Sequence, residues 1–165
     1  MFMSPENNKQ TSVSPFDKII LFLDKSEAEY RLIEHDLAHS SQEESEITGK
    51  KLSQCAKALV LFGDRQPLMV VLSAENKIDF KKFKQKMKIK DLRMATPEQV
   101  KEITGAEIGT VSPLGNLFNL PLYVDEQLAK EEEIVFGTGL STKSIIMKCS
   151  DYCQIANPVI GDYVG

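Results

Sequence analysis

The sequence predicts a single α+β domain built on a mixed, largely antiparallel sheet. Its 165 residues are enough for one domain with a proper core, and 42% hydrophobic and 27% charged residues are typical of a globular protein. Segments with strand character outnumber helical ones, and several strands follow one another directly along the chain. Adjacent strands favour an α+β fold over the regular alternation of a parallel sheet.

Two helices and three strands are expected in the first half of the chain. In order they are a helix over residues 14–28, a strand over 30–35, a helix over 41–49, and strands over 57–62 and 67–74. Pro15 stands at a first helical position, where its missing N–H costs nothing. Ser41 followed by Glu44 has the spacing of a capping box, and Gly49 is a typical helix terminator. The run "GDRQ" predicts a hairpin between the last two strands.

The second half predicts two more helices and four more strands. A lysine-rich helix follows Asp79, and after it come a strand over 90–95, a helix over 95–105, and strands over 120–126, 132–139 and 143–149. Asp79 is a favourable helix cap. The second helix has Thr96 as its cap, Pro97 at its first position and Gln99 at its third. Gly105 ends it, and a loop rich in glycine and proline follows.

The first 13 residues are expected to form a polar, mobile tail in front of one domain over residues 14–165. They have neither the basic nor the apolar region of a secretory signal. No apolar run approaches the roughly 20 residues of a membrane span, so no membrane partner is expected. The three cysteines are most simply reduced thiols. These features predict a cytoplasmic protein.

The net charge of −4 argues against a general nucleic-acid binder, and DNA is not an expected partner. Residues 77–90 nevertheless carry seven lysines against one aspartate. Apolar side chains at helical spacing predict that this segment packs one face inward, namely Ile78, Phe80, Phe83 and Met87. Lys81, Lys84 and Lys88 then share one outer stripe. This stripe is either a phosphate-binding face or an ordinary solvated one.

Lys57 stands at the start of a strand that is otherwise apolar. Side chains alternate between the two faces of a strand, so Lys57 shares a face with Leu59 and Leu61. Its ammonium group either extends to water from the strand end or serves a function there. Cys55 lies on the same face, which allows a lysine-activated thiolate, whereas a buried structural cysteine is the simpler alternative.

The stretch "TGAEIGTVSPLGN" is a second candidate for function. Its glycines let the backbone approach a ligand closely, and Pro113 stiffens the turn. Successive exposed N–H groups in such a loop can hold an anion or a developing oxyanion. The alternative is a plain connection. The stretch matches neither the phosphate-loop pattern nor the dinucleotide fingerprint.

A zinc site is the alternative that the histidines and cysteines raise. His35 and His39 form H-x3-H, and Cys149 and Cys153 form C-x3-C. His35 lies in a predicted strand, and neither pair has the C-x2-C spacing of a zinc knuckle. We therefore expect no metal and no cofactor.

Six blocks of sequence resemble, in order and spacing, the YbaK/ProX-type aminoacyl-tRNA editing domains, which act in trans on mischarged tRNA. The blocks are "EHD", "AKALVL", "ATPEQVKEITGAEIGTVSPLGN", "LPLYVDEQL", "IVFGTG" and "SIIMKCSDY", between about residues 16 and 153. The resemblance implies a barrel-like mixed sheet surrounded by helices. It also implies a cleft for the aminoacylated end of tRNA.

By this resemblance, Lys57 corresponds to the functional lysine of the family and His35 to the histidine of its first strand. The G-x-x-x-P loop of the family corresponds to Gly109, Thr110, Val111, Ser112 and Pro113. The lysine stripe at Lys81, Lys84 and Lys88 is the candidate contact with the tRNA acceptor stem.

Two positions depart from the family pattern. Ile33 stands where editing enzymes can carry an aromatic residue, and Gly137 stands where Ser or Asn is common before the second glycine, Gly139. All three are expected to line the substrate pocket. The departures leave the amino-acid specificity open.

The expected chemistry is hydrolysis of an activated ester. Such a reaction needs positioning, a water molecule and stabilisation of the carbonyl oxygen. A partly desolvated lysine can hold the ester or the terminal ribose and phosphate, and the loop N–H groups would face the carbonyl. In the family the neighbouring ribose hydroxyl is thought to assist, which suits the lack of a Ser-His-Asp pattern here.

We therefore expect a cytoplasmic deacylase that removes a wrong amino acid from tRNA in translation quality control, with Cys or Ala on proline tRNA as its first candidates. Aminoacyl-tRNA is the expected partner, and delivery by an aminoacyl-tRNA synthetase is left open. The rival hypothesis is an inactive module of the same fold that binds only tRNA or a protein. Lys57 and the complete G-x-x-x-P loop favour the enzyme.

Overall fold

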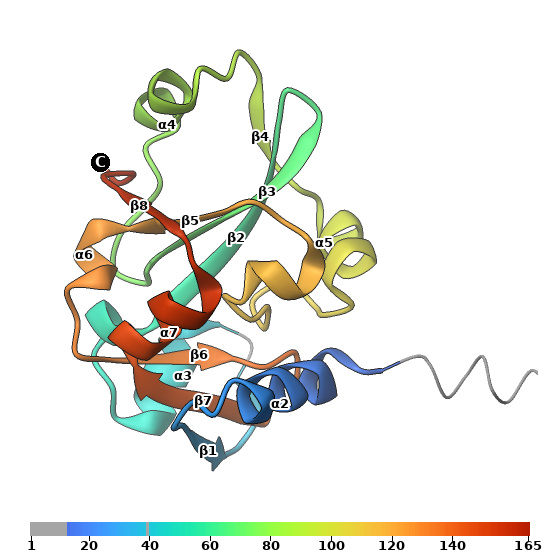
Figure 1. Cartoon of the computed structure of the whole chain (residues 1–165), viewed down its shortest axis with the longest axis vertical. Helices are drawn as coiled ribbons and strands as arrows, with labels where there is room; N and C mark the ends of the chain where they lie inside the picture. Colours follow the sequence, from blue (N-terminus) through green and yellow to red (C-terminus); the bar gives the residue numbers. More distant parts are fainter. Residues whose placement is uncertain (1–12, 39) are drawn as a thin grey trace, which may run out of the picture.

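The structure is a computed structural model that describes residues 13–38 and 40–165. Two sheets form its centre and helices lie around them (Figure 1). The predicted N-terminal tail lies outside the described residues apart from Val13. The α+β fold predicted from the sequence is confirmed.

The smaller sheet has three antiparallel strands in the order β1-β7-β6. Its strands are β1 (Arg31–Glu34), β6 (Glu133–Gly137) and β7 (Lys143–Lys148). Helix α2 (Pro15–Lys25) runs beside this sheet in Figure 1. Its buried residues Ile19 and Leu23 join the main core together with Phe136 and Ile145 of the sheet.

The larger sheet has five strands in the order β4-β2-β3-β5-β8. They are β2 (Ala56–Gly63), β3 (Gln66–Ser73), β4 (Leu92–Met94), β5 (Leu122–Asp125) and β8 (Val159–Gly161). The β2–β3 hairpin and β4 are antiparallel, whereas β5 joins β3, and β8 joins β5, in parallel. The mixed, largely antiparallel pairing is as predicted.

The two sheets do not close into a barrel, so this part of the prediction is wrong. A barrel needs its outer strands to pair with each other. Here β4 pairs with β2 and β8 with β5, and the large sheet stays open at both edges. The sheets meet at an isolated parallel bridge between Cys55 and Val135, at the start of β2.

The remaining helices connect or cover the strands. They are α3 (Ser41–Thr48), the 3-10 turns η1 (Leu52–Gln54) and η2 (Gly115–Phe118), α4 (Phe80–Met87), α5 (Pro97–Thr104), α6 (Glu126–Ala129) and α7 (Cys149–Ala156). The sequence analysis missed α6, α7 and β8. The strand predicted to reach Cys149 ends at Lys148, because Cys149, Tyr152 and Ala156 recur at helical spacing and bury one face of α7.

Most predicted helix ends are confirmed. Asp79 caps α4, and Thr96 and Gln99 form a reciprocal capping box on α5. The cap of α3 was placed one residue too late, since the hydroxyl of Ser40 accepts the hydrogen bond from the Glu43 N–H. Glu44 does not reach back to the cap, because Ser144 of β7 engages its carboxylate.

A second, smaller core lies beneath α4. Phe83 is fully buried there and makes edge-on contacts with Tyr123 and Tyr163 at centroid distances of 5.2 and 5.3 Å. Ile78, Phe80 and Met87 pack against the same core, together with Leu59 and Leu61 of β2. The apolar stripe predicted for the lysine-rich helix is therefore confirmed. Among the helices of the described residues, none is long and apolar enough to cross a membrane.

Candidate active site

A small pocket forms where α3, the start of β2, the loop after α5 and the end of β6 meet. Its volume is about 30 Å³. Small side chains dominate its wall, and two charged residues belong to it. The lining residues are Ser41, Glu44, Ala56, Lys57, Ala58, Gly109, Val111 and Gly137. The structure thus brings Lys57 and part of the G-x-x-x-P loop to one pocket.

Lys57 is half-buried at the second position of β2. Its ammonium group donates a hydrogen bond of 2.9 Å to the carbonyl of Asn76, which leaves two of its N–H groups for another partner. Burial lowers the pKa of Lys57, and the nearby charge of Lys77 lowers it further. A cation that is partly desolvated in this way interacts more strongly with an oxygen anion than an exposed lysine does.

The G-x-x-x-P loop divides into an exposed part and a buried part. Gly109 is exposed with a φ of 91°, a left-handed conformation that suits glycine. The hydroxyl of Ser112 accepts a hydrogen bond from the Leu114 N–H, and the carbonyl of Pro113 accepts one from Tyr152. Thr110 to Pro113 are all buried; Thr110 and Val111 still line pockets beside Gly109, whereas Ser112 and Pro113 line neither of the two pockets at this site.

Gly137 fits closely against the loop. A Cβ atom at this position would lie 2.8 Å from the carbonyl oxygen of Thr110. The same oxygen accepts a hydrogen bond of 2.7 Å from the N–H of Gly139. A side chain such as Ser or Asn would displace the loop, which gives a physical reason for glycine at this departure from the family pattern.

A second hollow, of about 10 Å³, shares Glu44, Gly109 and Gly137 with the first. His35 and Ser144 lie in its wall. The Nε2 atom of His35 is 2.8 Å from the hydroxyl oxygen of Ser144, and Ser144 donates to the carboxylate of Glu44. The Nδ1 atom of His35 lies 2.6 Å from the carbonyl of Asp36. A continuous polar chain therefore leads from His35 to the pocket.

Glu44 and Ser144 were missed in the sequence analysis. Glu44 is only 6% exposed, and burial raises its pKa despite the hydrogen bond from Ser144 and the proximity of His35. Glutamate within a helix rarely signals a buried site, and its position three residues after Ser41 suggested a cap instead. Ile33 lies elsewhere, packed against the small cluster of Cys55, Val135 and Ile146.

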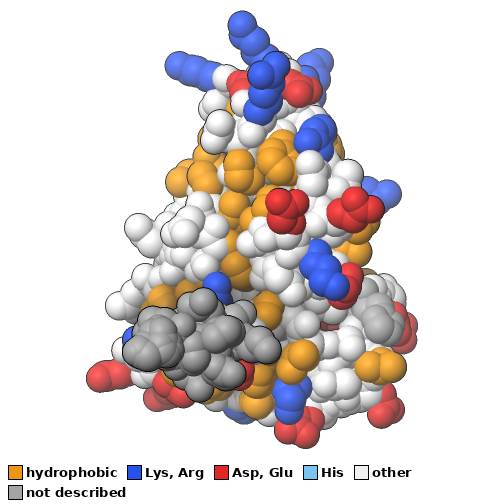
Figure 2. Space-filling view, turned by 90° about the vertical axis from the view of Figure 1, so that its right-hand side faces the viewer, with side chains coloured by type: hydrophobic (Ala, Val, Ile, Leu, Met, Phe, Trp, Pro, Cys, Tyr) orange, Lys and Arg blue, Asp and Glu red, His pale blue; other side chains and the backbone are white. Residues whose placement is uncertain are grey.

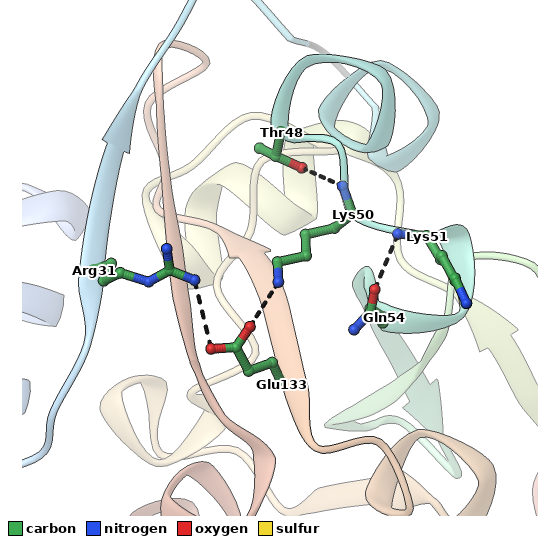
Figure 3. Close-up of polar contacts among 6 residues, drawn as sticks. All are labelled: Arg31, Thr48, Lys50, Lys51, Gln54 and Glu133. Atoms are coloured by element: carbon green, nitrogen blue, oxygen red, sulfur yellow. Dashed lines mark hydrogen bonds and ion pairs between the residues drawn. The ribbon is translucent and has the colours of Figure 1, made fainter.

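Ion pairs tie the segment after α3 to the smaller sheet (Figure 3). The Glu133 carboxylate of β6 accepts a hydrogen bond of 2.6 Å from Lys50 and faces Arg31 of β1 at 3.5 Å. The Lys50 N–H also donates to the Thr48 hydroxyl at the end of α3. These contacts fix the end of the helix that carries Glu44.

The two rival chemistries find little support in this geometry. Cys55 is fully buried, and burial together with the charge of Glu44 raises its pKa to about 12, so its thiol is not activated. Cys149 and Cys153 lie on α7. Within the described part of the chain, no three potential ligands among His, Cys, Asp and Glu converge on a point, and His39 lies outside it.

The lysine-rich helix lies at the opposite, narrow end of the molecule, where Lys and Arg side chains gather in Figure 2. Lys82 is engaged there by Asp162 and by the carbonyl of Val164. Lys88 is not part of the helical stripe, because it forms the left-handed cap after Met87. Lys81 and Lys84 remain on the helix, beside a shallow hollow that Phe80, Gln85 and Ile89 help to line.

The chain belongs to the aminoacyl-tRNA editing domain family, whose model matches residues 35–155. It is accordingly a hydrolase of the aminoacyl-tRNA ester bond, and the predicted family and enzyme class are confirmed. Lys57, the G-x-x-x-P loop, Glu44, Ser144 and His35 all lie within the matched range.

Individual relatives are consistent with this family. The chain is 30% identical over 151 residues to the multifunctional Ser/Thr-tRNA deacylase ProXp-y of Escherichia coli K12, with 88% of this chain and 90% of the relative covered. It is 28% identical over 109 residues to a proline–tRNA ligase of Solidesulfovibrio magneticus, covering 66% of this chain and 19% of the ligase. A solved structure described as a candidate trans-editing enzyme for prolyl-tRNA synthetase superposes with a TM-score of 0.78, at 23% identity, over 93% of this chain and 99% of the other.

Proposed function

We propose that this protein hydrolyses the ester of mischarged tRNA in trans, as a cytoplasmic enzyme of translation quality control. The observation that carries the proposal is one pocket that is lined by Lys57 and by Gly109 and Val111 of the G-x-x-x-P loop. An ester held there would face a cation and a loop backbone at once.

Lys57 and the loop have different roles in ester hydrolysis. The N–H groups of Gly109 and Val111 have no acceptor within the described residues, so they are free to stabilise the oxyanion that develops on the carbonyl. The ammonium group of Lys57 holds the ester or the terminal ribose and phosphate. Should Lys57 lose its proton, which its lowered pKa makes easier, it could instead act as a general base.

The size of the pocket favours a small amino acid. Ala56, Ala58, Gly109 and Gly137 give the pocket a wall of small residues and leave it narrow, which favours a short side chain over the ring of proline. An enzyme with such a pocket would spare correctly charged proline tRNA. Cys or Ala on proline tRNA therefore remains our first proposal, and the similarity to proline–tRNA ligases supports it.

Serine or threonine is the second candidate. The Escherichia coli relative is a Ser/Thr-tRNA deacylase by name. In this chain, Ser41 adds a hydroxyl to the small residues of the pocket wall, and a hydroxyl can bind the hydroxyl of a substrate side chain. The similarity to ligases also suggests that an aminoacyl-tRNA synthetase delivers the substrate, although the chain covers only 19% of the ligase.

A deacylation panel tests this function. The purified protein is incubated with Ala-, Cys-, Ser-, Thr- and Pro-charged tRNA, and the loss of ester is followed under single-turnover conditions. Lys57→Ala should abolish hydrolysis with little loss of stability, because it leaves no large apolar void. Arginine at this position should not restore activity, since a guanidinium is planar and bulkier.

Lys130→Ala is the control, because Lys130 is an exposed lysine that lines neither hollow of the site. It should retain nearly full activity. Full activity of Lys57→Ala on every substrate would contradict the assigned role of the lysine. A wild-type protein that binds these tRNAs and hydrolyses none would support the inactive binding module instead.

A further inference from the structure

Glu44 lines the pocket, and one of its two carboxylate oxygens is engaged by a described residue. Its Oε2 atom accepts the hydrogen bond from Ser144, and no described residue donates to Oε1. No fully buried side-chain oxygen or nitrogen among the described residues lacks a partner. Oε1 must therefore be reached by solvent, and Glu44 lines both hollows of the site. The pocket thus has a carboxylate in one part of its wall and Lys57 in another.

Ser144 and His35 fix the position of this carboxylate. The carbonyl of Asp36 can only accept a hydrogen bond, so the adjacent Nδ1 atom of His35 carries a proton. Because Ser144 donates to Glu44, the Ser144 oxygen is left to accept from Nε2 of His35. Hydrogen bonds thus connect His35, Ser144 and Glu44 in series and hold the carboxylate in place.

The aminoacyl end of a charged tRNA carries one cationic group of its own, the α-ammonium. The ammonium nitrogen and the ester carbonyl carbon are bonded to the same carbon atom, so an anchor for the first also positions the second. Oε1 of Glu44 is an acceptor-only atom of negative charge in a pocket of small residues. Its chemistry matches an ammonium group.

On the basis of the proposed deacylase function, we propose that Glu44 binds the α-ammonium group of the aminoacyl ester and that Ser144 and His35 hold it in position. Lys57 and the loop then act on the ester, while Glu44 orients it. The site would select esters with a free α-amino group over N-acylated or hydroxy-acid esters. Peptidyl-tRNA and N-formylated tRNA would escape hydrolysis for this reason.

A purely structural role for Glu44 is the alternative, since its bond to Ser144 joins α3 to β7. A buried charge that serves only to join two elements stabilises the fold little, because the cost of desolvating the charge offsets most of the electrostatic attraction. The two roles also differ in what they predict. A structural Glu44 would affect all ligands of the pocket alike, whereas an ammonium anchor would affect only cationic ones.

The test compares two stable ligands of equal size. Alanine and lactate are each joined through an amide bond to the 3′-amino analogue of the terminal adenosine, so that one ligand carries an ammonium group and the other a hydroxyl. Binding is measured by titration calorimetry at pH 6.5. The wild type should bind the alanyl ligand about 10- to 100-fold more tightly than the lactyl ligand, as expected for a charge-assisted hydrogen bond.

Glu44→Gln should remove most of this preference while binding the lactyl ligand as the wild type does. The glutamine keeps the size of the side chain, and its carbonyl oxygen can still accept from Ser144. Glu46→Gln, an exposed position on the same helix, is the control and should keep the full preference. Ser144→Ala should reduce the preference in part.

Three outcomes would overturn the inference: equal binding of both ligands by the wild type, an unchanged preference in Glu44→Gln, or an equal loss of both ligands in that variant. Because these ligands are not hydrolysed, the result does not depend on turnover. Selective binding of the alanyl ligand by a protein that hydrolyses no ester in the deacylation panel would support the ammonium-binding role of Glu44 and contradict the proposed enzymatic function.

Discussion

The hydroxyl of Tyr152 donates a hydrogen bond of 2.6 Å to the carbonyl of Pro113 and so joins α7 to the end of the G-x-x-x-P loop. Tyr152 is completely buried, and its contact with Pro113 spans 39 positions in the sequence. The bond satisfies a carbonyl in the interior and fixes the far end of the loop whose near end lines the pocket.

Tyr152→Phe is therefore expected to reduce both stability and activity. It leaves the Pro113 carbonyl without its partner, which should lower the free energy of unfolding by about 1–3 kcal/mol. Urea denaturation measures this loss, and single-turnover deacylation below the unfolding transition measures the effect on the loop.

Tyr30→Phe is the matched control, because the Tyr30 hydroxyl bonds to Asp24 on the exposed surface. Its effect should stay below about 0.5 kcal/mol. Equal stability of the Tyr152 and Tyr30 variants would show that the buried bond contributes little.

Gly137→Ala is expected to displace the loop from the other side. The new Cβ would lie 2.8 Å from the Thr110 carbonyl oxygen, a backbone atom that cannot rotate away. We expect a maximal deacylation rate at least about tenfold lower, since misplaced loop donors lose contact with the transition state. The same variant should lose about 1–3 kcal/mol of stability from overpacking.

Gly63→Ala separates these two effects. At this position the nearest atom to a new Cβ is the flexible end of Ile89, at 2.9 Å, at the far end of β2. It should cost some stability and leave the maximal rate unchanged. A Gly137→Ala enzyme with the parental rate would show that the loop tolerates the displacement or plays no part in the chemistry.

Local signals explain which features the sequence predicted. Thr96, Pro97 and Gln99 define the start of α5 without reference to the rest of the chain, and the structure agrees. The alternation around Lys57 likewise located β2. The open edges of the large sheet were not predictable, because pairing between distant strands leaves no local pattern.

The polar chain at the pocket was missed for a related reason. Glu44 and Ser144 are 100 positions apart, and only the pairing of β1 with β7 brings His35 and Ser144 together. Glu44 lies on a helix whose exposed neighbours are mostly polar, so nothing local marks it as buried. A buried carboxylate is identified by its distant partners, and one sequence does not reveal them.

The lysine stripe provides a third prediction, which concerns tRNA rather than the ester. Replacement of Lys81 and Lys84 on α4, together with Lys88 at the cap that follows the helix, with glutamine should weaken binding of cognate and non-cognate tRNA alike. The dependence of affinity on salt should flatten by up to about two to three units of slope, since each phosphate contact contributes close to one. Turnover at saturating enzyme should hardly change, because these contacts position the tRNA.

The same number of exposed lysines can be removed elsewhere as a control. Lys18 and Lys25 on α2 and Lys130 after α6 are exposed, and their replacement alters the net charge equally. This variant should bind nearly as the parent does. If both triple variants weaken binding to the same degree, the effect is one of net charge, and the stripe is an ordinary solvated face.

The raised pKa of Glu44 predicts how stability depends on pH. Burial favours the protonated form, so between the ordinary pKa of 4.5 and the raised native value the folded protein binds more protons than the unfolded chain. Stability linked to Glu44 is then present at low pH and is lost as the pH rises through the native pKa. Glutamine at position 44 cannot titrate. The free energy of unfolding of Glu44→Gln should therefore rise relative to that of the wild type over this window, by at most about 1.4 kcal/mol for each unit of pKa shift.

Urea denaturation of both proteins at half-unit intervals between pH 4 and 8 measures this difference in stability, from which the contributions of other titrating groups cancel. The difference between Glu46→Gln and the wild type should stay flat over the same range. If the difference in stability between Glu44→Gln and the wild type is also flat, or falls as the pH rises, the pKa of Glu44 is not raised in the folded protein.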